Sequence, residues 1–343
     1  MIRNQHGHWK TWLRTREREN RECIPLILHI GMEKTGSKAI QTWLADQREK
    51  LAEEGWYIPT SLGPINHRQV AFLGYDKSRR DDGTQRRGIN TDEELKRYKD
   101  EVTKRLKMEV ETAKALRKDA MIISTELASS RLIHRREIRK LIISMKEANC
   151  SPILVTLFRR NPADLMESRY STAVLHEGWR GLNPAKAGSK EANLFGDQIG
   201  LQQRWWSVIK KIEGVSFDVY AYTKQNLLGG SSAATVANFM GCKERIIQSA
   251  KDLRSNRPLP LVNLRALMIM NRLEAVKLFK INVISRYIRR YFLEVKIGRW
   301  KYSIPKRLRH KYSDQYKSSI IPEDAGWLLW SSWEGTNELG GNS

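Results

Sequence analysis

The sequence has 343 residues, of which 40% are apolar, and it carries a formal net charge of +23 at pH 7. This apolar content supports a hydrophobic core and excludes a chain that is disordered throughout, and the length fits one large α/β domain or two small ones. The 61 Lys and Arg against 38 Asp and Glu predict an anionic partner: nucleic acid, anionic lipid, acidic polysaccharide or a phosphorylated cofactor.

The cysteine content and the hydropathy of the chain indicate the cellular compartment in which the protein is expected. Cys23, Cys150 and Cys242 are widely spaced and odd in number, which predicts neither a disulfide framework nor a zinc site and favours a reducing compartment. The first twenty residues lack the apolar core of a signal peptide, and no run approaches the ~20 apolar residues of a transmembrane helix. We therefore expect a cytoplasmic protein.

Four short, near-continuous apolar runs predict strands that are buried on both faces, as in a parallel sheet covered by helices. These runs are residues 24–31, 120–126, 152–159 and 215–222.

Helical patterns separate the apolar runs. Residues 37–54 place apolar side chains at helical intervals, a Thr-Asp-Glu-Glu capping box opens a long charged helix over 91–117, and an Asn-Pro start opens a helix over 161–176. Residues 75–91 are charged and poor in apolar side chains, so we expect a loop there. Strands that alternate with helices predict a parallel α/β sheet.

The positive charge is concentrated late in the chain. Residues 251–312 contain 17 Lys or Arg against three acidic residues, and 258–312 has the pattern of basic amphipathic helices. We expect a basic N-terminal extension over 1–23, an α/β core over 24–245, a basic helical part of the same domain over 246–335 and a flexible tail over 336–343.

The stretch His29-Ile-Gly-Met-Glu-Lys-Thr-Gly-Ser-Lys38 follows the first predicted strand and precedes the first predicted helix. A glycine-rich turn in that context points backbone N–H groups and a helix N-terminus at an anion. A nucleoside-triphosphate P-loop requires Lys at position 37 and a hydroxyl at 38, whereas Ser37 and Lys38 stand in the reverse order. No predicted strand ends in the Asp of such a site. The order disfavours an ATPase or GTPase, which stays open as an alternative.

Lys34-Thr35-Gly36-Ser37, after Gly31, resembles the 5′-phosphosulfate loop of PAPS-dependent sulfotransferases of the bacterial type. PAPS is 3′-phosphoadenosine 5′-phosphosulfate. The resemblance implies that Lys34 stabilises the bridging oxygen and the sulfuryl group, while the loop holds the 5′-phosphate. Lys38 stands where the family often has a second hydroxyl; its ammonium would either contact a phosphate or face solvent.

A second stretch, Phe-Arg-Arg-Asn-Pro-Ala-Asp-Leu-Met-Glu-Ser over 158–168, is similar to the family's R-N-P-x-D motif with a Ser eight residues after the Arg. The resemblance implies that Arg160 and Ser168 hold the 3′-phosphate of PAPS, and a guanidinium suits a phosphate because it donates two parallel hydrogen bonds. The likeness covers about residues 24–245. A basic stretch over 254–257 would match the family's late cofactor loop.

The resemblance implies a P-loop-like three-layer α/β/α fold with a central parallel sheet, followed here by the basic C-terminal helices. It also implies sulfuryl transfer from PAPS to a hydroxyl or amine by in-line displacement, with no metal. Glu126 and His67 are the candidates for the general base, because Glu126 follows a predicted strand and His67 lies in a loop after the first helix. The sequence leaves the choice between them open. His29, on the strand, is expected to be buried structure.

Two other functions stay open: a non-catalytic polyanion-binding protein on a degenerate sulfotransferase scaffold, and a P-loop kinase or NTPase with an aberrant loop. For the leading hypothesis we expect an acidic saccharide or a glycolipid as acceptor and peripheral contact of the basic helices with an anionic membrane, and we disfavour nucleic acid. Trp327, Trp330 and Trp333 could stack on sugar rings, but their helical spacing with Leu328 and Leu329 favours core or packing residues. The sequence specifies neither the acceptor nor the oligomeric state.

Overall fold

The computed structural model of the protein describes residues 8–16, 22–252, 260–275, 283–295, 302–322 and 325–332. The chain divides into two compact units. Unit 1 comprises residues 1–159, 200–253 and 323–343, and unit 2 comprises residues 160–199 and 254–322.

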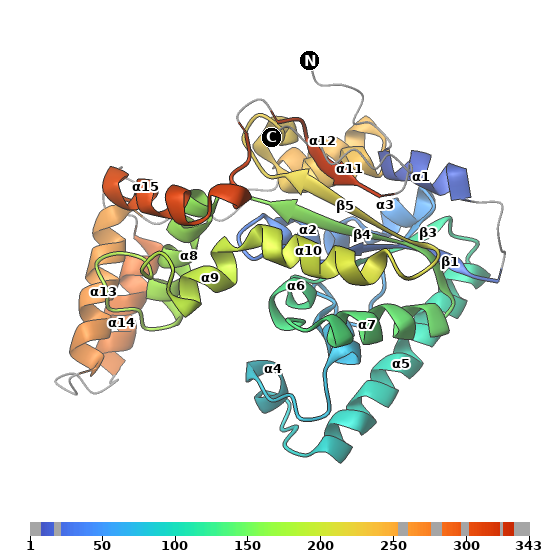
Figure 1. Ribbon diagram of the computed structural model, residues 1–343, viewed down its shortest axis with the longest axis horizontal. Coiled ribbons are helices and arrows are strands. Elements are labelled where there is room, and N and C mark those ends of the chain that lie inside the picture. The colour runs from blue at the N-terminus through green and yellow to red at the C-terminus, as the bar shows by residue number, and fades with distance from the viewer. Residues whose placement is uncertain are drawn as a thin grey trace. The chain divides into compact units, whose positions relative to one another are not determined.

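Unit 1 is built on a six-stranded sheet in the order β2-β3-β1-β4-β5-β6 (Figure 1). The first five strands are parallel, and β6 pairs with β5 in the antiparallel direction. All four strands predicted from the apolar runs are confirmed, and the α/β class with them. The strands are β1 Ile24–His29, β2 Trp56–Tyr57, β3 Ala120–Ser124, β4 Cys150–Arg159, β5 Val215–Ala221 and β6 Leu328–Ser331.

Helices cover both faces of this sheet, which explains the near-continuous apolar runs. On one face, Ile27, Leu154 and Tyr220 pack in one cluster with side chains of α1, α2, α11 and α12; α5 and α7 lie on the other face (Figure 1). The helices of unit 1 are α1 His8–Arg16, α2 Ser37–Asp46, α3 Arg48–Glu53, η1 Arg68–Gly74, α4 Asp82–Gln85, α5 Asp92–Ala115, α6 Leu127–Arg131, α7 Arg135–Glu147, most of α10 Gln198–Ile209, η2 Leu228–Gly230, α11 Ser232–Phe239 and α12 Glu244–Asp252.

Sequence signals at helix ends correctly predicted where several helices begin. The capping box at Thr91 forms as predicted: its side chain accepts from the Glu94 N–H, and the Glu94 side chain accepts from the Thr91 N–H. The helix predicted over 37–54 is instead two helices, because the backbone leaves helical geometry at Gln47, with φ of −101°. The expected loop over 75–91 contains the short helix α4.

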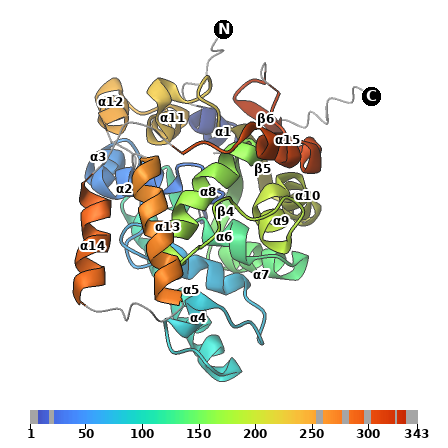
Figure 2. The same ribbon diagram turned by 90° about the vertical axis from the view of Figure 1, so that its left-hand side faces the viewer.

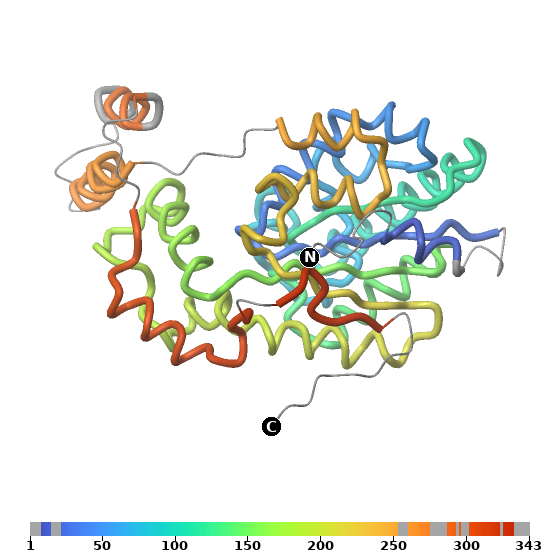
Figure 3. The backbone as a smooth tube through the Cα atoms, turned by 90° about the horizontal axis from the view of Figure 1, so that it is seen from above, coloured from blue at the N-terminus to red at the C-terminus, as the bar shows by residue number. Residues whose placement is uncertain are grey.

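The packing role predicted for the late tryptophans is confirmed for Trp327 and Trp330, but their helical spacing does not correspond to a helix. Trp330 lies on β6 and not on a helix, because this stretch pairs with β5 at the edge of the sheet, where Figure 3 shows red β6 beside yellow β5. The Trp330 ring packs edge-to-face on Phe217 at 5.5 Å. Trp333 lies outside the described residues.

The segment 1–23, expected as a basic extension, contains the core helix α1. Trp9 and Trp12 are fully buried, since their spacing places both indoles on the face that packs against the sheet. The Trp9 indole N–H donates to the Tyr220 hydroxyl at 2.9 Å, and His8 Nε2 lies 3.1 Å from Asp218 Oδ2. These contacts join α1 to the middle of β5.

Unit 2 is helical, and three of its helices fall in the range predicted to hold basic amphipathic helices. Its core joins Tyr170 and Val174 of α8 to apolar side chains of α13, and α13 and α14 lie side by side (Figure 2). No helix in the described parts of the chain is both long and apolar enough to cross a membrane. The helices of unit 2 are α8 Pro162–His176, α9 Lys190–Gly196, α13 Leu261–Ala275, α14 Val283–Glu294, α15 Lys306–Gln315 and η3 Lys317–Ser319.

Candidate functional site

The strand order of unit 1 defines where a ligand would bind. From β1 the chain proceeds to β2 and β3 on one side of the sheet and then to β4 and β5 on the other. In open α/β sheets, ligands bind outside the carboxyl ends of the strands at such a switch point. The loop over 31–36 leaves β1 at this point and leads directly into α2.

The loop is tightly curled about the carbonyl of Met32. That carbonyl accepts hydrogen bonds from the Thr35 N–H at 3.3 Å, the Thr35 hydroxyl at 2.6 Å and the Ser37 hydroxyl at 3.3 Å. Gly31, Lys34 and Gly36 have positive φ values of 27°, 67° and 79°. Because a side-chain-bearing residue rarely adopts this conformation, the left-handed Lys34 marks a loop whose shape is imposed by its surroundings.

Gly36 is the N-cap of α2, and its carbonyl accepts a hydrogen bond from the Ser232 hydroxyl of α11 at 3.2 Å. A Cβ at Gly36 would lie 2.2 Å from that hydroxyl oxygen, so only glycine fits. Gly36 has no side chain with which to cap α2. The first N–H groups of the helix therefore receive no hydrogen bond from the N-cap side chain, and with the positive end of the helix dipole they are a suitable arrangement for a phosphate.

The side chains of this loop divide into buried and accessible ones. Thr35 is fully buried and Ser37 is 5% exposed. Their hydroxyls stabilise the loop internally, because both donate to the Met32 carbonyl. Lys34 is half-buried, and Lys38 is exposed on the first turn of α2. Lys34 and Lys38 thus add two positive charges to the loop and the first turn of α2.

Glu126 lies at the carboxyl end of β3, just before α6. Its carboxylate accepts from Gln41 Nε2 of α2 at 2.7 Å, and Asn66 Nδ2 donates to both of its oxygens at 3.0 Å. Gln41 is one helical turn beyond Ser37, so the carboxylate and the loop share one edge of the sheet. The sequence analysis missed Gln41 and Asn66; the i, i+4 spacing of Ser37 and Gln41 is the signal that could have found the first.

His67 is held differently. Its ring is 1% exposed, its Nδ1 accepts from the Ser124 N–H at 2.9 Å, and its Nε2 donates to the Pro59 carbonyl at 3.0 Å. Burial lowers the pKa of His67 to about 4, so the ring is neutral at pH 7. With both nitrogens engaged inside the protein, His67 joins the loop before η1 to the end of β3.

Arg160 and Ser168 belong to unit 2. The side-chain amide of Gln198 holds the backbone of Arg160 from both sides: its Oε1 accepts from the Arg160 N–H at 2.9 Å, and its Nε2 donates to the Arg160 carbonyl. Asn161 Oδ1, at the start of α8, accepts from the Ile321 N–H at 2.8 Å. Arg160 and Ser168 are half-buried, and Ser168 lies two turns into α8.

Arg159, the last residue of β4, points into unit 1 instead. It is 6% exposed, and its Nη1 donates to Gln202 Oε1 of α10 at 3.2 Å. Burial lowers the pKa of Arg159 to about 10, which leaves it charged at neutral pH. Of the two arginines, Arg160 is the more accessible. The stretch 254–257 lies outside the described residues.

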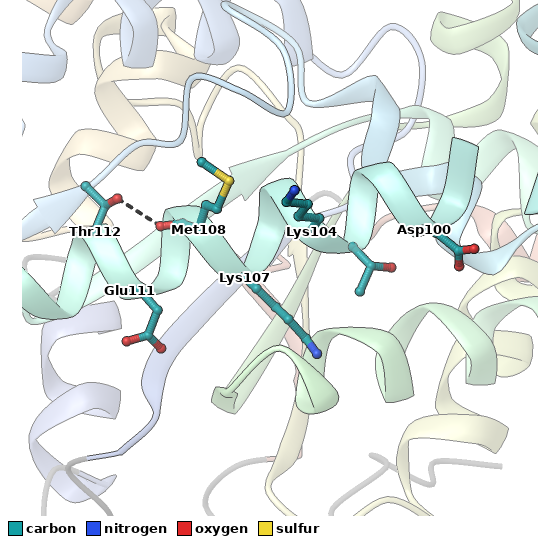
Figure 4. A pocket seen from close by; sticks show the side chains of 7 residues that line it. Asp100, Lys104, Lys107, Met108, Glu111 and Thr112 are labelled. Carbon is teal, nitrogen blue, oxygen red and sulfur yellow. Dashed lines mark hydrogen bonds between the residues drawn. The ribbon is translucent and has the colours of Figure 1, made fainter. Parts of the chain in front are cut away.

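Other features give no comparable site. A hollow of about 650 Å³ lies along α5, but one helix lines it and no group from a second element converges there (Figure 4). Within the described ranges, no three His, Cys, Asp or Glu side chains are grouped to hold a metal ion. The hollow is lined by Asp100, Thr103, Lys104, Lys107, Met108, Glu111 and Thr112.

No family model matches the chain, and no curated protein matches it. Among solved structures, it is similar to a chain reported in the molecular and structural characterization of the PezAT chromosomal toxin–antitoxin system of Streptococcus pneumoniae. The identity is 12%, the match covers 76% of this chain and 94% of that chain, and the TM-score is 0.27. A likeness this slight carries no inference about function.

Proposed function

We propose that the protein is a PAPS-dependent sulfotransferase that transfers the sulfuryl group to a hydroxyl or amine of an acceptor. The observation that supports this most is the loop over 31–36 at the switch point of the sheet, with a left-handed Lys34 and an uncapped helix start. A carboxylate, Glu126, lies at the same edge of the sheet, tied to α2 through Gln41. Sulfuryl transfer needs a site for the phosphate, a cation to neutralise the leaving group and a base for the acceptor proton. The loop, Lys34 and Glu126 would supply these three groups.

In this proposal the 5′-phosphate of PAPS binds to the backbone N–H groups of Thr35, Gly36, Ser37 and Lys38. Gly31 and Gly36 allow the loop to pack closely on Ser37 and Ser232, since a Cβ at either glycine would lie within 2.5 Å of a serine hydroxyl oxygen. Arg160 and Ser168 bind the 3′-phosphate, an assignment that rests on the motif resemblance. A guanidinium at the start of a helix is suited to that charge.

The reaction is an in-line displacement at sulfur. The bond from sulfur to the bridging phosphate oxygen breaks, the acceptor oxygen or nitrogen forms a new bond to sulfur, and the acceptor proton moves to a base. Lys34 neutralises the charge that develops on the leaving phosphate. We assign the base to Glu126, because its carboxylate is half-buried at the edge where ligands bind, whereas both ring nitrogens of His67 are already engaged.

The excess of positive charge favours an acidic saccharide or a glycolipid as acceptor, met in the cytoplasm or at an anionic membrane surface. Two alternatives make different predictions. A polyanion-binding protein on this scaffold would bind heparin-like polymers with steep salt dependence and would not turn over PAPS. A kinase or NTPase would prefer ATP.

Calorimetric titration with adenosine 3′,5′-bisphosphate, ATP and AMP tests the proposal. We expect tight binding of the bisphosphate alone, lost in Lys34→Ala and Arg160→Ala and retained in the control Arg97→Ala, an exposed arginine on α5. Weak and equal binding of all three nucleotides, or a preference for ATP, would contradict it. Turnover of PAPS with a panel of hydroxyl and amine acceptors follows if the bisphosphate binds.

A further inference from the structure

A row of buried polar side chains crosses the sheet just below the loop. Ser124, His29, Thr156 and Asp218 are register partners on the adjacent strands β3, β1, β4 and β5, and all four are fully buried. Register partners in a parallel sheet point to the same face, here the face covered by α2 and α11. A polar row in an apolar layer costs stability unless its atoms find partners, so each member needs an explanation.

His29 is the member of this row that reaches the loop. Its Nδ1 lies 2.8 Å from Ser124 Oγ, and its ring packs edge-to-face on Phe158 at 5.5 Å. Its Nε2 is buried and has no hydrogen-bond partner among the described residues. A buried, unpartnered polar atom at the end of β1 indicates a partner that comes from outside the chain.

The geometry at Gly31 shows where Nε2 is directed. A Cβ placed on Gly31 would lie 3.0 Å from His29 Cε1, 3.1 Å from Nε2 and 2.5 Å from Ser37 Oγ. The edge of the imidazole and the Ser37 hydroxyl therefore both pack closely against Gly31 at the start of the loop. Glycine at position 31 permits this close approach, which places Nε2 beside the residues that lead into the N-terminus of α2.

The contact with Ser124 allows the tautomer of His29 in which Nε2 carries the proton. Burial lowers the pKa of His29 to about 4, so the ring is neutral at pH 7. Among the described residues, His29 Nδ1 is the one hydrogen-bond partner of Ser124 Oγ. When the Ser124 hydroxyl donates to Nδ1, the ring proton resides on Nε2 and makes Nε2 a donor, which is the tautomer that an anion at Nε2 would select.

We propose that His29 is a further ligand of the bound nucleotide: its Nε2–H donates to an oxygen of the 5′-phosphate in the loop, and Ser124 is the positioning residue that fixes this tautomer. The inference rests on the proposed function, because that function places a phosphate in the loop. It adds a neutral donor beneath the loop to the lysine charges and backbone N–H groups. Adenosine 3′-monophosphate, which lacks the 5′-phosphate, would not use this contact.

Calorimetry with two nucleotides and matched variants tests the contact. We expect His29→Leu to bind adenosine 3′,5′-bisphosphate about 10- to 100-fold more weakly, the range for a hydrogen bond to a charged group, and adenosine 3′-monophosphate with unchanged affinity. Ser124→Ala should lose less affinity for the bisphosphate than His29→Leu does. Thr156→Val removes a second buried, unpartnered polar atom from the same row and, if the contact is specific to His29, should keep full affinity.

A measurement on the unmutated protein covers the case in which His29→Leu does not fold. With ¹⁵N-histidine labelling, the Nε2 resonance of His29 should show a bound proton and should shift with the bisphosphate but not with the 3′-monophosphate. If the wild-type protein binds the bisphosphate while His29→Leu binds it equally well, or the resonance does not move, the His29 contact is overturned and the proposed function stands. If the wild-type protein binds neither nucleotide, the proposed function fails, and the contact fails with it.

Discussion

His8 and Asp218 are 210 positions apart in the sequence, yet His8 Nε2 lies 3.1 Å from the Asp218 carboxylate. The carboxylate is fully buried, and it also accepts from the Tyr220 hydroxyl at 2.9 Å. We predict that His8→Ala lowers the free energy of unfolding by about 1–3 kcal/mol, because it removes a partner from a buried acceptor. Urea unfolding measures the change. Thr11→Ala, on the exposed side of α1, is the control, and equal losses in the two variants would contradict the prediction.

Stability should fall as the pH is lowered from about 6.5 to about 4. Burial lowers the pKa of both His29 and His67 to about 4, below the ordinary 6.5, so between these values the unfolded chain binds protons that the native protein does not. Each ring contributes up to about 3 kcal/mol, fully present above pH 6.5 and lost as the pH falls towards 4. Thermal unfolding across this range measures the slope, which should flatten in His29→Gln and His67→Gln. A slope unaffected by both substitutions would refute the assignment.

Glu126→Gln distinguishes the two candidates for the base. If Glu126 accepts the acceptor's proton, the variant should lose about 10²- to 10⁴-fold in kcat and keep its affinity for adenosine 3′,5′-bisphosphate. His67→Gln should mainly lower stability, because both of its ring nitrogens bond within the protein. Steady-state kinetics with PAPS, alongside unfolding curves, separates these effects. The opposite pattern would transfer the role of base to His67.

Gly36→Ala should abolish nucleotide binding and reduce stability. The alanine would have to adopt φ near 79° and place its Cβ 2.2 Å from Ser232 Oγ. Gly88→Ala is a matched control, since Gly88 has φ of 65° and an added Cβ there would meet no other atom within 4 Å. We expect the free energy of unfolding to fall by about 1 kcal/mol in Gly88→Ala, from backbone strain alone, and by more in Gly36→Ala. Equal losses, measured by thermal unfolding, would show that the contact with Ser232 has no effect.

The helix α14 and the residue after it, Val295, carry an exposed apolar stripe in the basic part of the chain. Tyr287, Tyr291 and Val295, four positions apart, are 69%, 52% and 42% exposed. Aromatic side chains among arginines are typical of helices that lie on anionic lipid. We predict co-sedimentation with phosphatidylserine vesicles, weaker at high salt and weaker in Tyr287→Ser/Tyr291→Ser. Binding that is equal on phosphatidylcholine vesicles would argue against a role for charge.

The sequence was sufficient where the signal is local. The glycine loop, the capping box at Thr91 and the Asn-Pro start of α8 depend on neighbouring residues, and each appears at the predicted place. The parallel strands were predictable because burial on both faces leaves an unbroken apolar run. Helix spacing alone could not show that Gln47 interrupts the first helix.

Long-range contacts account for what was missed. Trp330 has helical spacing to its neighbours but pairs with β5, more than a hundred positions earlier. Trp9 belongs to a segment of basic character, yet the sheet buries it. The i, i+4 spacing places Gln41 on the same face of α2 as Ser37, but its meeting with Asn66 and Glu126 depends on three elements that converge at one edge of the sheet.

The contact between Gly36 and Ser232 carries an evolutionary constraint. The two positions are 196 residues apart, but the Ser232 hydroxyl donates to the Gly36 carbonyl and fills the space where a Cβ would be. Substitutions at 36 and 232 are therefore coupled: a larger side chain at either position requires a compensating change at the other. Among homologous chains the two positions should covary, and a genetic screen for suppressors of loop defects should recover changes at the start of α11.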